Sequence, residues 1–532
     1  NNTVVGFDGK ASFDAPWLTR FIDKIPLLQT KEPSSVNFSG EWAQILPGVA
    51  RTNQVERQVQ AGDLYPDEDR GVSFIDDFEG VRNTIPFQNA GRWLLAAGPA
   101  AIPGYDLGFE NPVTYTNSQA DRIARQNLRA QFTWYSIPIG VSFGLPLGPE
   151  SIILQQSDLF QRNFQQQQED ILRTFDVYYN PMERGPYNYN MNLRQMLENE
   201  PERMWGGMTT TLPNNLANLD QNNYEFIEFW VQFVLPDGRE PTATDLLDYE
   251  GKIFFDIGQI SEDVIPNAQF NSEDGLEDRD DKSLDEPGIS YIQTTQVNRD
   301  GAFAQETIAD EDVGLDGVAS SKDGPDSEEI LFADFVSKME IDYADQPDVV
   351  ERIRADPSND DFVFWQDAPN RDPSVDRIHK AFYRFLGYHE GNSVNPGRQS
   401  TPRPDTEGLL SPSNQNLVDK YFQYQLDINP ADTTTLQIGE NYIVDKVSYG
   451  SRFYENYYLF RIPLREFTRR TGGIEDFSQI THIRMWMTGY KQPFTTRFAT
   501  FEFVGSQWRK ALNLYDENAF TKFNIATINR EE

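Results

Sequence analysis

The alternation of apolar and polar residues predicts β-strands at many places along this chain and helices at few. Residues 225–235, with the sequence EFIEFWVQFVL, give the strongest strand pattern, because apolar residues occupy most positions on both faces of an extended chain. A strand of this kind is covered on both sides. We therefore expect residues 225–235 to form a central strand of a β-sandwich.

A different strand pattern lies near the N-terminus. Val36, Phe38 and Trp42 alternate with polar residues after a turn sequence at residues 33–35. One face of this strand is apolar and the other polar. Residues 1 to about 50 are therefore expected to form a hairpin of two strands.

These patterns together predict a mainly β protein with two jelly-roll-like β-sandwiches, short helices and long acidic loops. Residues 266–330 are rich in glycine and aspartate and have few large apolar side chains, so they cannot form a core alone. The expected divisions are hairpin strands at 1–60, a first sandwich at 73–265, the acidic loop region at 266–330, mixed short helices and loops at 331–405, a second sandwich at 406–510 and a C-terminal tail at 511–532.

The acidic composition limits the partners of the chain. Its 46 lysines and arginines face 83 aspartates and glutamates, for a formal net charge of −37 at pH 7. Such a charge repels nucleic acid and anionic lipid head groups. Adaptation to a high-salt habitat, a calcium-rich exterior and plain solubility are three explanations of the acidity that composition leaves open.

Residues that common catalysts use are scarce. The chain has no cysteine, which excludes disulfides, thiol catalysis and cysteine-bound zinc. Its three histidines, His379, His389 and His482, stand far apart, so neither a catalytic triad nor a histidine-rich metal site is expected. Glycoside hydrolysis needs a pair of carboxylates, but a chain with 83 acidic residues always offers some pair, so such a pair does not indicate this activity. We expect no catalytic residue, no cofactor-binding residue and no required cofactor.

The chain also lacks the signals of membrane helices and export. No apolar run approaches the ~20 residues of a transmembrane helix. The first residues, NNTVVGFDGK, have neither the basic nor the apolar region of a signal peptide. If the protein is exported, this chain is expected to begin downstream of its signal, as part of something larger.

Two groups of carboxylates are candidate calcium ligands, because hard cations prefer clustered carboxylates together with backbone oxygens. They are Asp310, Asp312 and Asp316, and Asp76, Asp77 and Glu79. In the first group Gly314 stands where an EF-hand loop needs an oxygen ligand, so the match to that motif fails. The alternatives are an acidic turn for the first group and, for the second, a solvated strand edge whose charges discourage pairing.

Aromatic residues offer another candidate surface. Residues 179–190, YNPMERGPYNYN, carry tyrosines that could stack on sugar rings or on a passing polypeptide. A rigid loop braced by proline and glycine is the favoured alternative. If the protein binds carbohydrate, Trp205 and Tyr187 are the residues whose replacement should abolish binding.

Nine phrases between Ile25 and Arg509 have long and unusual sequences. They are KIPLLQTKEPSSVNFSGEWAQ, SFIDDFEG, ERGPYNYN, RMWGGM, FIEFW, GQISEDV, DVGLDG, HIRMWMTGY and RFATFEFVGSQWR. Together they resemble the SprA (Sov) family. These are the giant outer-membrane translocon proteins of the Bacteroidetes type IX secretion system, which are also needed for gliding motility.

This resemblance implies a role in secretion and no catalytic chemistry. Family members form a very large single-chain barrel through which folded cargo passes. They work with an outer-membrane partner of PorV type and a periplasmic plug protein, and extracellular insertions between barrel strands form a cap over the pore. This chain is far too short to close such a barrel. It is therefore expected to be a segment, with barrel-type strands at residues 1–60 and a cap that begins near SFIDDFEG.

The function expected from the resemblance is that of a non-enzymatic cap segment on the extracellular face of the outer membrane. Such a cap would direct the exit of folded cargo at the cell surface. The alternative is a carbohydrate-binding or adhesive β-sandwich protein of the cell surface.

Overall fold

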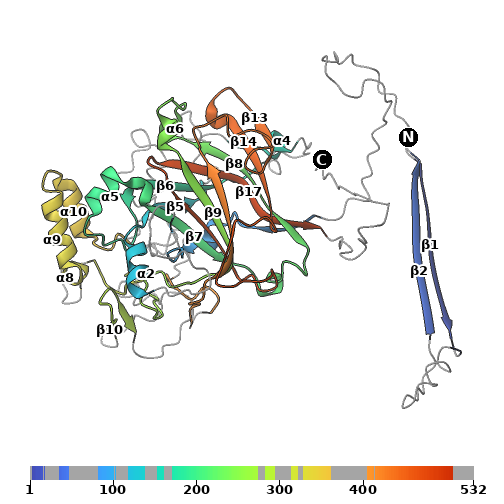
Figure 1. Cartoon of the computed structure of the whole chain (residues 1–532), viewed down its shortest axis with the longest axis horizontal. Coiled ribbons are helices and arrows are strands. Elements are labelled where there is room, and N and C mark those ends of the chain that lie inside the picture. Colours follow the sequence, from blue (N-terminus) through green and yellow to red (C-terminus); the bar gives the residue numbers. More distant parts are fainter. Residues whose placement is uncertain are drawn as a thin grey trace. The chain divides into compact units, whose positions relative to one another are not determined.

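The structure is a computed structural model. It describes residues 3–15, 17, 35–46, 82–100, 102, 118–137, 153–160, 171–273, 282–293, 313–320, 327–360, 404–411 and 414–506. The chain divides into two compact units, Asn1–Glu79 and Gly80–Glu532, and each is described by itself (Figure 1).

The first unit contains the predicted hairpin. Strands β1 (Thr3–Asp14) and β2 (Ser35–Leu46) have 12 residues each and pair antiparallel along their whole length. The register runs without a bulge from Thr3 opposite Leu46 to Asp14 opposite Ser35. The second strand begins at Ser35, one residue before the predicted alternation, and the prediction of a two-stranded hairpin is confirmed.

The second unit is a β-sandwich of two antiparallel sheets. The six-stranded sheet has the order β15 (Arg469–Thr471), β12 (Lys420–Ile428), β9 (Gly251–Gln259), β16 (His482–Thr488), β7 (Trp205–Thr211) and β4 (Leu94–Leu95). The seven-stranded sheet has the order β13 (Ile443–Ser448), β14 (Asn456–Pro463), β8 (Tyr224–Val234), β17 (Phe494–Ser506), β6 (Phe175–Arg184) and β5 (Ala130–Tyr135), and β3 (Arg82–Pro86) pairs with β17.

Short helices and one small hairpin surround the sandwich. The helices are α2 (Gln119–Gln126), α4 (Gln156–Leu159), α5 (Leu193–Asn199), α6 (Asp245–Asp248), α8 (Glu328–Leu331), α9 (Ala333–Asp342) and α10 (Pro347–Ala355). Within the described residues, 3-10 turns lie at Ala90–Arg92, Pro201–Arg203, Asn214–Leu216, Pro236–Gly238 and Phe453–Glu455, and β10 (Lys282–Leu284) pairs with β11 (Tyr291–Gln293). Helices α5, α8, α9 and α10 gather on one side of the unit (Figure 1). No helix in the described ranges is long and apolar enough to cross a lipid bilayer.

Strand β8 shows why residues 225–235 are apolar on both faces. On its inner face the ring of Phe229 lies 5.4 Å from that of Phe255 on β9, in the opposite sheet. On its outer face Trp230 packs against Leu154 and Leu159, which lie beside and within α4. Because both faces are covered, the prediction of a central strand is confirmed.

The mainly β sandwich fold is confirmed, but its predicted division into two sandwiches is wrong. In one sheet β9 lies between β12 and β16, and in the other β8 lies between β14 and β17. Strands from residues 73–265 and from residues 406–510 therefore alternate within the same two sheets. Apolar alternation identifies a strand and its buried face but not its neighbour, so the long acidic segment between the two sets was mistaken for a domain boundary.

The interleaving of strands predicts that residues 404–506 do not fold alone. Expressed by themselves they lack β8 and β9, which separate their own strands in both sheets. We expect this fragment to show no near-ultraviolet circular dichroism and no dispersed amide resonances. Residues 82–506, the control, should show both and unfold in one cooperative transition. A fragment 404–506 with native dispersion would contradict the single-sandwich topology.

Candidate metal centre

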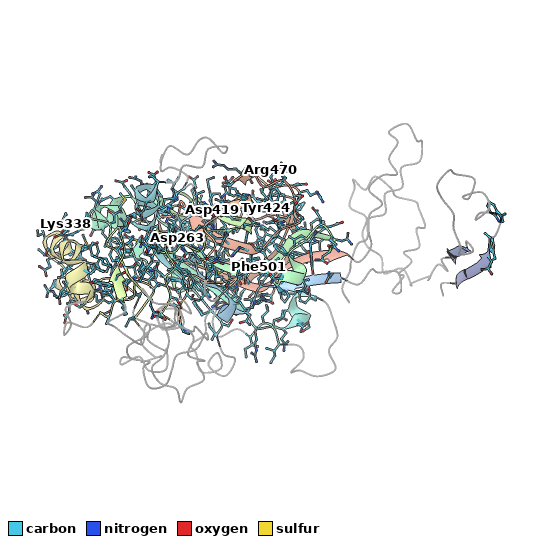
Figure 2. The ribbon with its side chains drawn as sticks, turned by 90° about the horizontal axis from the view of Figure 1, so that it is seen from below. Asp263, Lys338, Asp419, Tyr424, Arg470 and Phe501 are labelled. Atoms are coloured by element: carbon cyan, nitrogen blue, oxygen red, sulfur yellow. The ribbon has the colours of Figure 1, made fainter. Side chains whose placement is uncertain are left out.

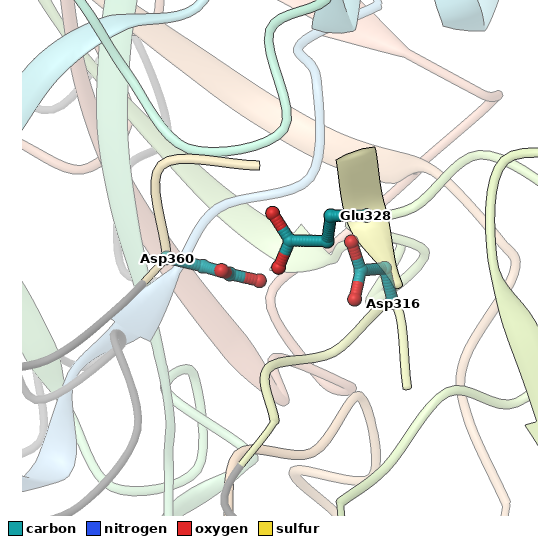
Figure 3. A group of neighbouring side chains, drawn as sticks. All are labelled: Asp316, Glu328 and Asp360. Atoms are coloured by element: carbon teal, nitrogen blue, oxygen red, sulfur yellow. The ribbon is translucent and has the colours of Figure 1, made fainter. Parts of the chain in front are cut away.

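Three buried carboxyl groups converge where the acidic loops meet the helices. They belong to Asp316 in the loop at 313–320, to Glu328 in the first turn of α8 and to Asp360 just beyond α10. One carboxylate oxygen from each residue lies within 4.8 Å of the other two, and Figure 3 shows the three groups facing one another. The exposed fractions are 0% for Asp316 and Glu328 and 4% for Asp360.

Hydroxyl and backbone donors hold two of these carboxylates in place. Asp316 accepts hydrogen bonds from Ser358 Oγ at 2.5 Å and from the Val318 amide at 3.0 Å. Glu328 accepts from the Ser358 amide at 2.8 Å and from Ser320 Oγ at 2.9 Å. Ser358 thus binds both acids, and it fixes the end of the helical segment against the acidic loop.

The protonation of the cluster follows from its burial. Burial raises the pKa of Asp316 to about 7, although the hydrogen bond from Ser358 acts in the opposite direction. Burial also raises the pKa of Glu328 well above its usual range, and the negative charges of Asp316 and Asp356 raise it further. These groups need either protons or a cation near neutral pH, because unpaired buried charges are costly.

Arg184, the arginine beside the cluster, donates its hydrogen bonds to backbone carbonyl oxygens. Arg184 donates to the carbonyl oxygens of Pro357 at 2.5 Å, Asp356 at 3.0 Å and Asn188 at 3.5 Å. Burial lowers its pKa, while the nearby charges of Asp356, Glu328 and Asp360 raise it. Its guanidinium group therefore offsets only part of the local negative charge.

The structure explains why residue 314 is a glycine, which the sequence alone did not. Its φ is +78°, and a Cβ atom at this position would collide with Oδ2 of Asp360. A side chain here would be strained and would also displace that carboxylate. The glycine that spoils the EF-hand spacing therefore lets a more distant acid approach the loop.

The structure brings together only part of the predicted ligand set. Asp316 lies in the cluster, whereas Asp310, Asp312, Asp76, Asp77 and Glu79 lie outside the described residues. Sequence reasoning missed Glu328 and Asp360. Their only local signals are the acidic phrases DSEE and SNDD, which resemble many others in so acidic a chain.

Other buried carboxylates nearby serve as caps for loop backbone. Glu273 accepts from the amides of Gly314 at 2.5 Å and Asp405 at 2.6 Å. Glu407 accepts from the amides of Ile265 and Asn271, both at 2.9 Å. Asp316 and Glu328 also accept from backbone amides, but they differ from these acids because their carboxylate oxygens and one of Asp360 lie within 4.8 Å of one another.

The cluster fits a hard cation by its chemistry. Calcium takes six to eight oxygen ligands and accepts carboxylates that bind through one or both oxygens. Three carboxyl groups, with the hydroxyls of Tyr189 and Ser358 beside Asp316, supply such oxygens. The same residues can instead share protons, and the two states differ in charge and in their dependence on pH.

The predicted glycan contacts do not occur on an exposed surface. Tyr187 and Trp205 are both 0% exposed, so neither ring can stack on a sugar. Tyr187 accepts a hydrogen bond from the Leu315 amide, and Trp205 Nε1 donates to the Arg125 carbonyl. The favoured alternative, a rigid loop at residues 179–190, is wrong for residues 179–184, which belong to strand β6, and applies only to residues 185–190.

His482 occupies a closed environment. It is 0% exposed, and its Nε2 lies 2.8 Å from Glu262 Oε1 while its Nδ1 lies 2.8 Å from Thr481 Oγ. The Thr481 hydroxyl also donates to the Gly258 carbonyl. The group joins β16 to the loop after β9, and its hydrogen bonds are those of a structural histidine. His379 and His389 lie outside the described residues.

Comparison with protein families identifies the C-terminal part of the chain. Residues 334–532 match the SprA_N family, described as a motility related/secretion protein. The chain carries a SprA-family segment. Comparison with curated proteins gives no match. The SprA-family match includes two of the phrases on which the resemblance was based, HIRMWMTGY and RFATFEFVGSQWR.

The SprA-family segment contributes only part of the carboxylate cluster. Asp360 and Ser358 fall within the matched residues, whereas Asp316 and Glu328 precede them. Strands β12 to β17 also fall within the match, and their sheet partners β8 and β9 do not. The cluster and the sandwich therefore both cross the boundary of the matched residues.

We predict that, in a chelating buffer, the chain loses stability as pH rises through neutrality. The folded pKa of Asp316, about 7, lies above its ordinary value of 3.8, so its contribution is complete below about pH 4 and is lost as pH rises through 7. The free energy of unfolding should fall by on the order of 4 kcal/mol over this range.

Asp316→Asn should remove that part of the pH dependence, because the amide cannot ionise. Asp334→Asn, which changes an exposed carboxylate on α9, is the matched control and should leave the profile intact. Denaturant unfolding at several pH values measures the effect. An identical profile for Asp316→Asn and the unchanged chain would show that Asp316 does not titrate in this range.

Proposed function

We propose that residues 82–506 form a non-enzymatic cap of a protein-secretion translocon, carried at the extracellular face of the outer membrane. The SprA-family match supplies the link to secretion and motility. The interior of the sandwich is packed with large side chains, and Trp93, Trp134, Trp205 and Trp486 are all fully buried. In the proposed role the module acts by its shape and surface.

The observation that carries this proposal is the pairing of the two ends of the sandwich. Strand β3 lies antiparallel to the last residues of β17, with Arg82 opposite Ser506. The chain therefore enters and leaves the module side by side. An insertion between two neighbouring strands of a membrane wall requires this arrangement, and a domain joined in series does not.

The hairpin of the first unit supports a connection to such a wall. Its strands of 12 residues exceed the ~9–11 residues that a tilted strand needs to cross the apolar core of a bilayer. The register places Phe7 opposite Trp42 and Asp8 opposite Glu41. From Phe7 to Asp14, apolar residues stand opposite apolar ones and polar residues opposite polar ones, which is the pattern of strands between lipid and a polar interior; Thr3 opposite Leu46 and Val5 opposite Gln44 depart from it.

In this role the cap would obstruct straight exit from a pore and favour lateral release of folded cargo. Partners of the whole protein would be secreted cargo, an outer-membrane protein of PorV type and a periplasmic plug protein, and gliding motility would depend on the same pathway. The charge of −37 would discourage adhesion of acidic polymers to the cap.

We also propose that the cluster of Asp316, Glu328 and Asp360 holds a calcium ion at neutral pH. The convergence of three buried carboxylates within 4.8 Å favours this second candidate activity. A bound cation would supply the positive charge that Arg184 only partly provides, and it would tie the acidic loop to the helical segment 327–360. The role proposed for the ion is structural.

The cap proposal predicts a loss of secretion when the module is removed from the full-length parent protein. Residues 87–501 would be replaced by a short turn, which leaves β3 and the end of β17 free to pair. We expect the shortened protein to reach the outer membrane while cargo in the medium and gliding both fall several-fold. Reinsertion of residues 87–501 should restore both. Normal secretion by the shortened protein would rule out the proposed role.

The calcium proposal predicts that calcium stabilises chelator-treated protein at pH 7.5. Saturation at 100 times the dissociation constant would add about 2.7 kcal/mol to the free energy of unfolding. Glu328→Gln should abolish this gain, whereas Glu329→Gln, which changes the partly exposed neighbour, should keep it. Calorimetric titration and thermal unfolding measure the effect. If millimolar calcium stabilises neither the unchanged chain nor the control, the cluster does not hold this ion.

A further inference from the structure

A small polar cavity lies away from the carboxylate cluster, beneath helix α2. Its volume is about 20 Å³. Arg122, Arg125 and Gln126 of α2 line one side, and Asp263 and Asp419, which follow β9 and precede β12, line the other, so two guanidinium groups and two carboxylates border the cavity. Figure 2 labels these two aspartates within the sandwich unit. The cavity therefore separates a helix from two loops that leave neighbouring strands of one sheet.

The helix side of the cavity offers hydrogen-bond donors. Gln126 is only 2% exposed, and its Nε2 has no hydrogen-bond partner among the residues that the structure describes. The same holds for Nε of Arg122, whose Nη1 is paired with Asp263. A buried amide donor without a partner destabilises the folded state, so such a group in a folded protein is expected to bind a ligand.

The loop side offers acceptors. Asp263 accepts hydrogen bonds from Arg122 and from the Ala268 amide, the latter at 3.0 Å. Asp419 accepts from the Ser261 amide at 3.1 Å. Each carboxylate oxygen has two lone pairs, so both groups can accept from a further donor.

Volume and charge together determine the class of ligand. A cavity needs roughly 10–15 Å³ to hold one water molecule, so this one accommodates a ligand of one or two waters and nothing larger. A halide ion would accept from Gln126 but would face two carboxylates without donating to them. A metal cation would face the guanidinium of Arg122. Water can accept on the helix side and donate on the loop side.

We propose that this cavity is a binding site for ordered water, which bridges Gln126 and Arg122 of α2 to the carboxylates of Asp263 and Asp419. The water fastens α2 to the loop after β9 and to the start of β12. Helix α2 has eight residues, and an isolated helix of that length is marginal in water. The bridge adds to the packing that keeps it folded against the sheet.

The first test is a crystal structure of the full chain at about 1.8 Å resolution, with a second crystal soaked in bromide. The proposal expects a peak about 2.7–3.2 Å from Gln126 Nε2 and from a carboxylate oxygen of Asp263 or Asp419, without anomalous signal from bromide. An empty cavity, a side chain that fills it, or a bromide peak would each overturn the proposal.

The second test uses the sign of a stability change and needs no crystal. Gln126→Met keeps the size of the side chain but removes the donor. If water satisfies Nε2, the melting temperature should fall by about 1–2 °C; if the amide is unsatisfied, its removal should raise the melting temperature. Gln119→Met, on the same helix but outside the cavity, is the matched control and should change it less. A rise for Gln126→Met would overturn the proposal.

Discussion

Two buried ion pairs, one in each sheet, couple strands that are distant in sequence. Arg484 on β16 donates from Nε and Nη2 to Oδ2 of Asp256 on β9, at 2.9 and 2.7 Å, and both side chains are 0% exposed. Arg497 on β17 lies 2.8 Å from Asp176 on β6. Leaving one member of such a pair alone in the core costs about 3–5 kcal/mol. The pairs therefore penalise any register that separates their partners, and they favour the placement of β9 beside β16 in one sheet and of β6 beside β17 in the other.

The acidic loops are held in place by hydrogen bonds to buried polar side chains and not by an apolar core. They contain few large apolar residues, yet residues such as Asn271, Glu273 and Asp316 are almost completely buried. Carboxylates and amides take the place of an apolar core by binding loop backbone, as Glu273 does with Gly314 and Asp405. This network exchanges hydrophobic stabilisation for directional bonds, which specify one conformation of the loops. It also leaves the three carboxylates of Asp316, Glu328 and Asp360 dependent on protons or a cation.

The sequence was informative about strands and uninformative about their neighbours. The pattern at residues 225–235 identified β8 as a central strand, because a strand that is buried on both faces carries apolar residues on both faces. The alternation from Val36 likewise placed β2. No comparable sequence pattern identifies β14 and β17 as the neighbours of β8, since any strand of suitable length with an apolar face could pair with it. Of the metal-site prediction, Asp316 lies at a cluster, but its companions Glu328 and Asp360 approach it only through the tertiary fold.

The strand order also determines how much of the molecule the SprA-family match describes. The matched residues 334–532 contain β12 to β17, of which β12, β15 and β16 belong to the six-stranded sheet and β13, β14 and β17 to the seven-stranded sheet. In that sheet β9 separates β12 from β16, and in the other sheet β8 separates β14 from β17. A sheet cannot omit its central strand without exposing the backbone groups and apolar faces of both neighbours. The family segment therefore requires strands supplied by residues before 334, and the physical module is the sandwich whose ends meet at Arg82 and Ser506.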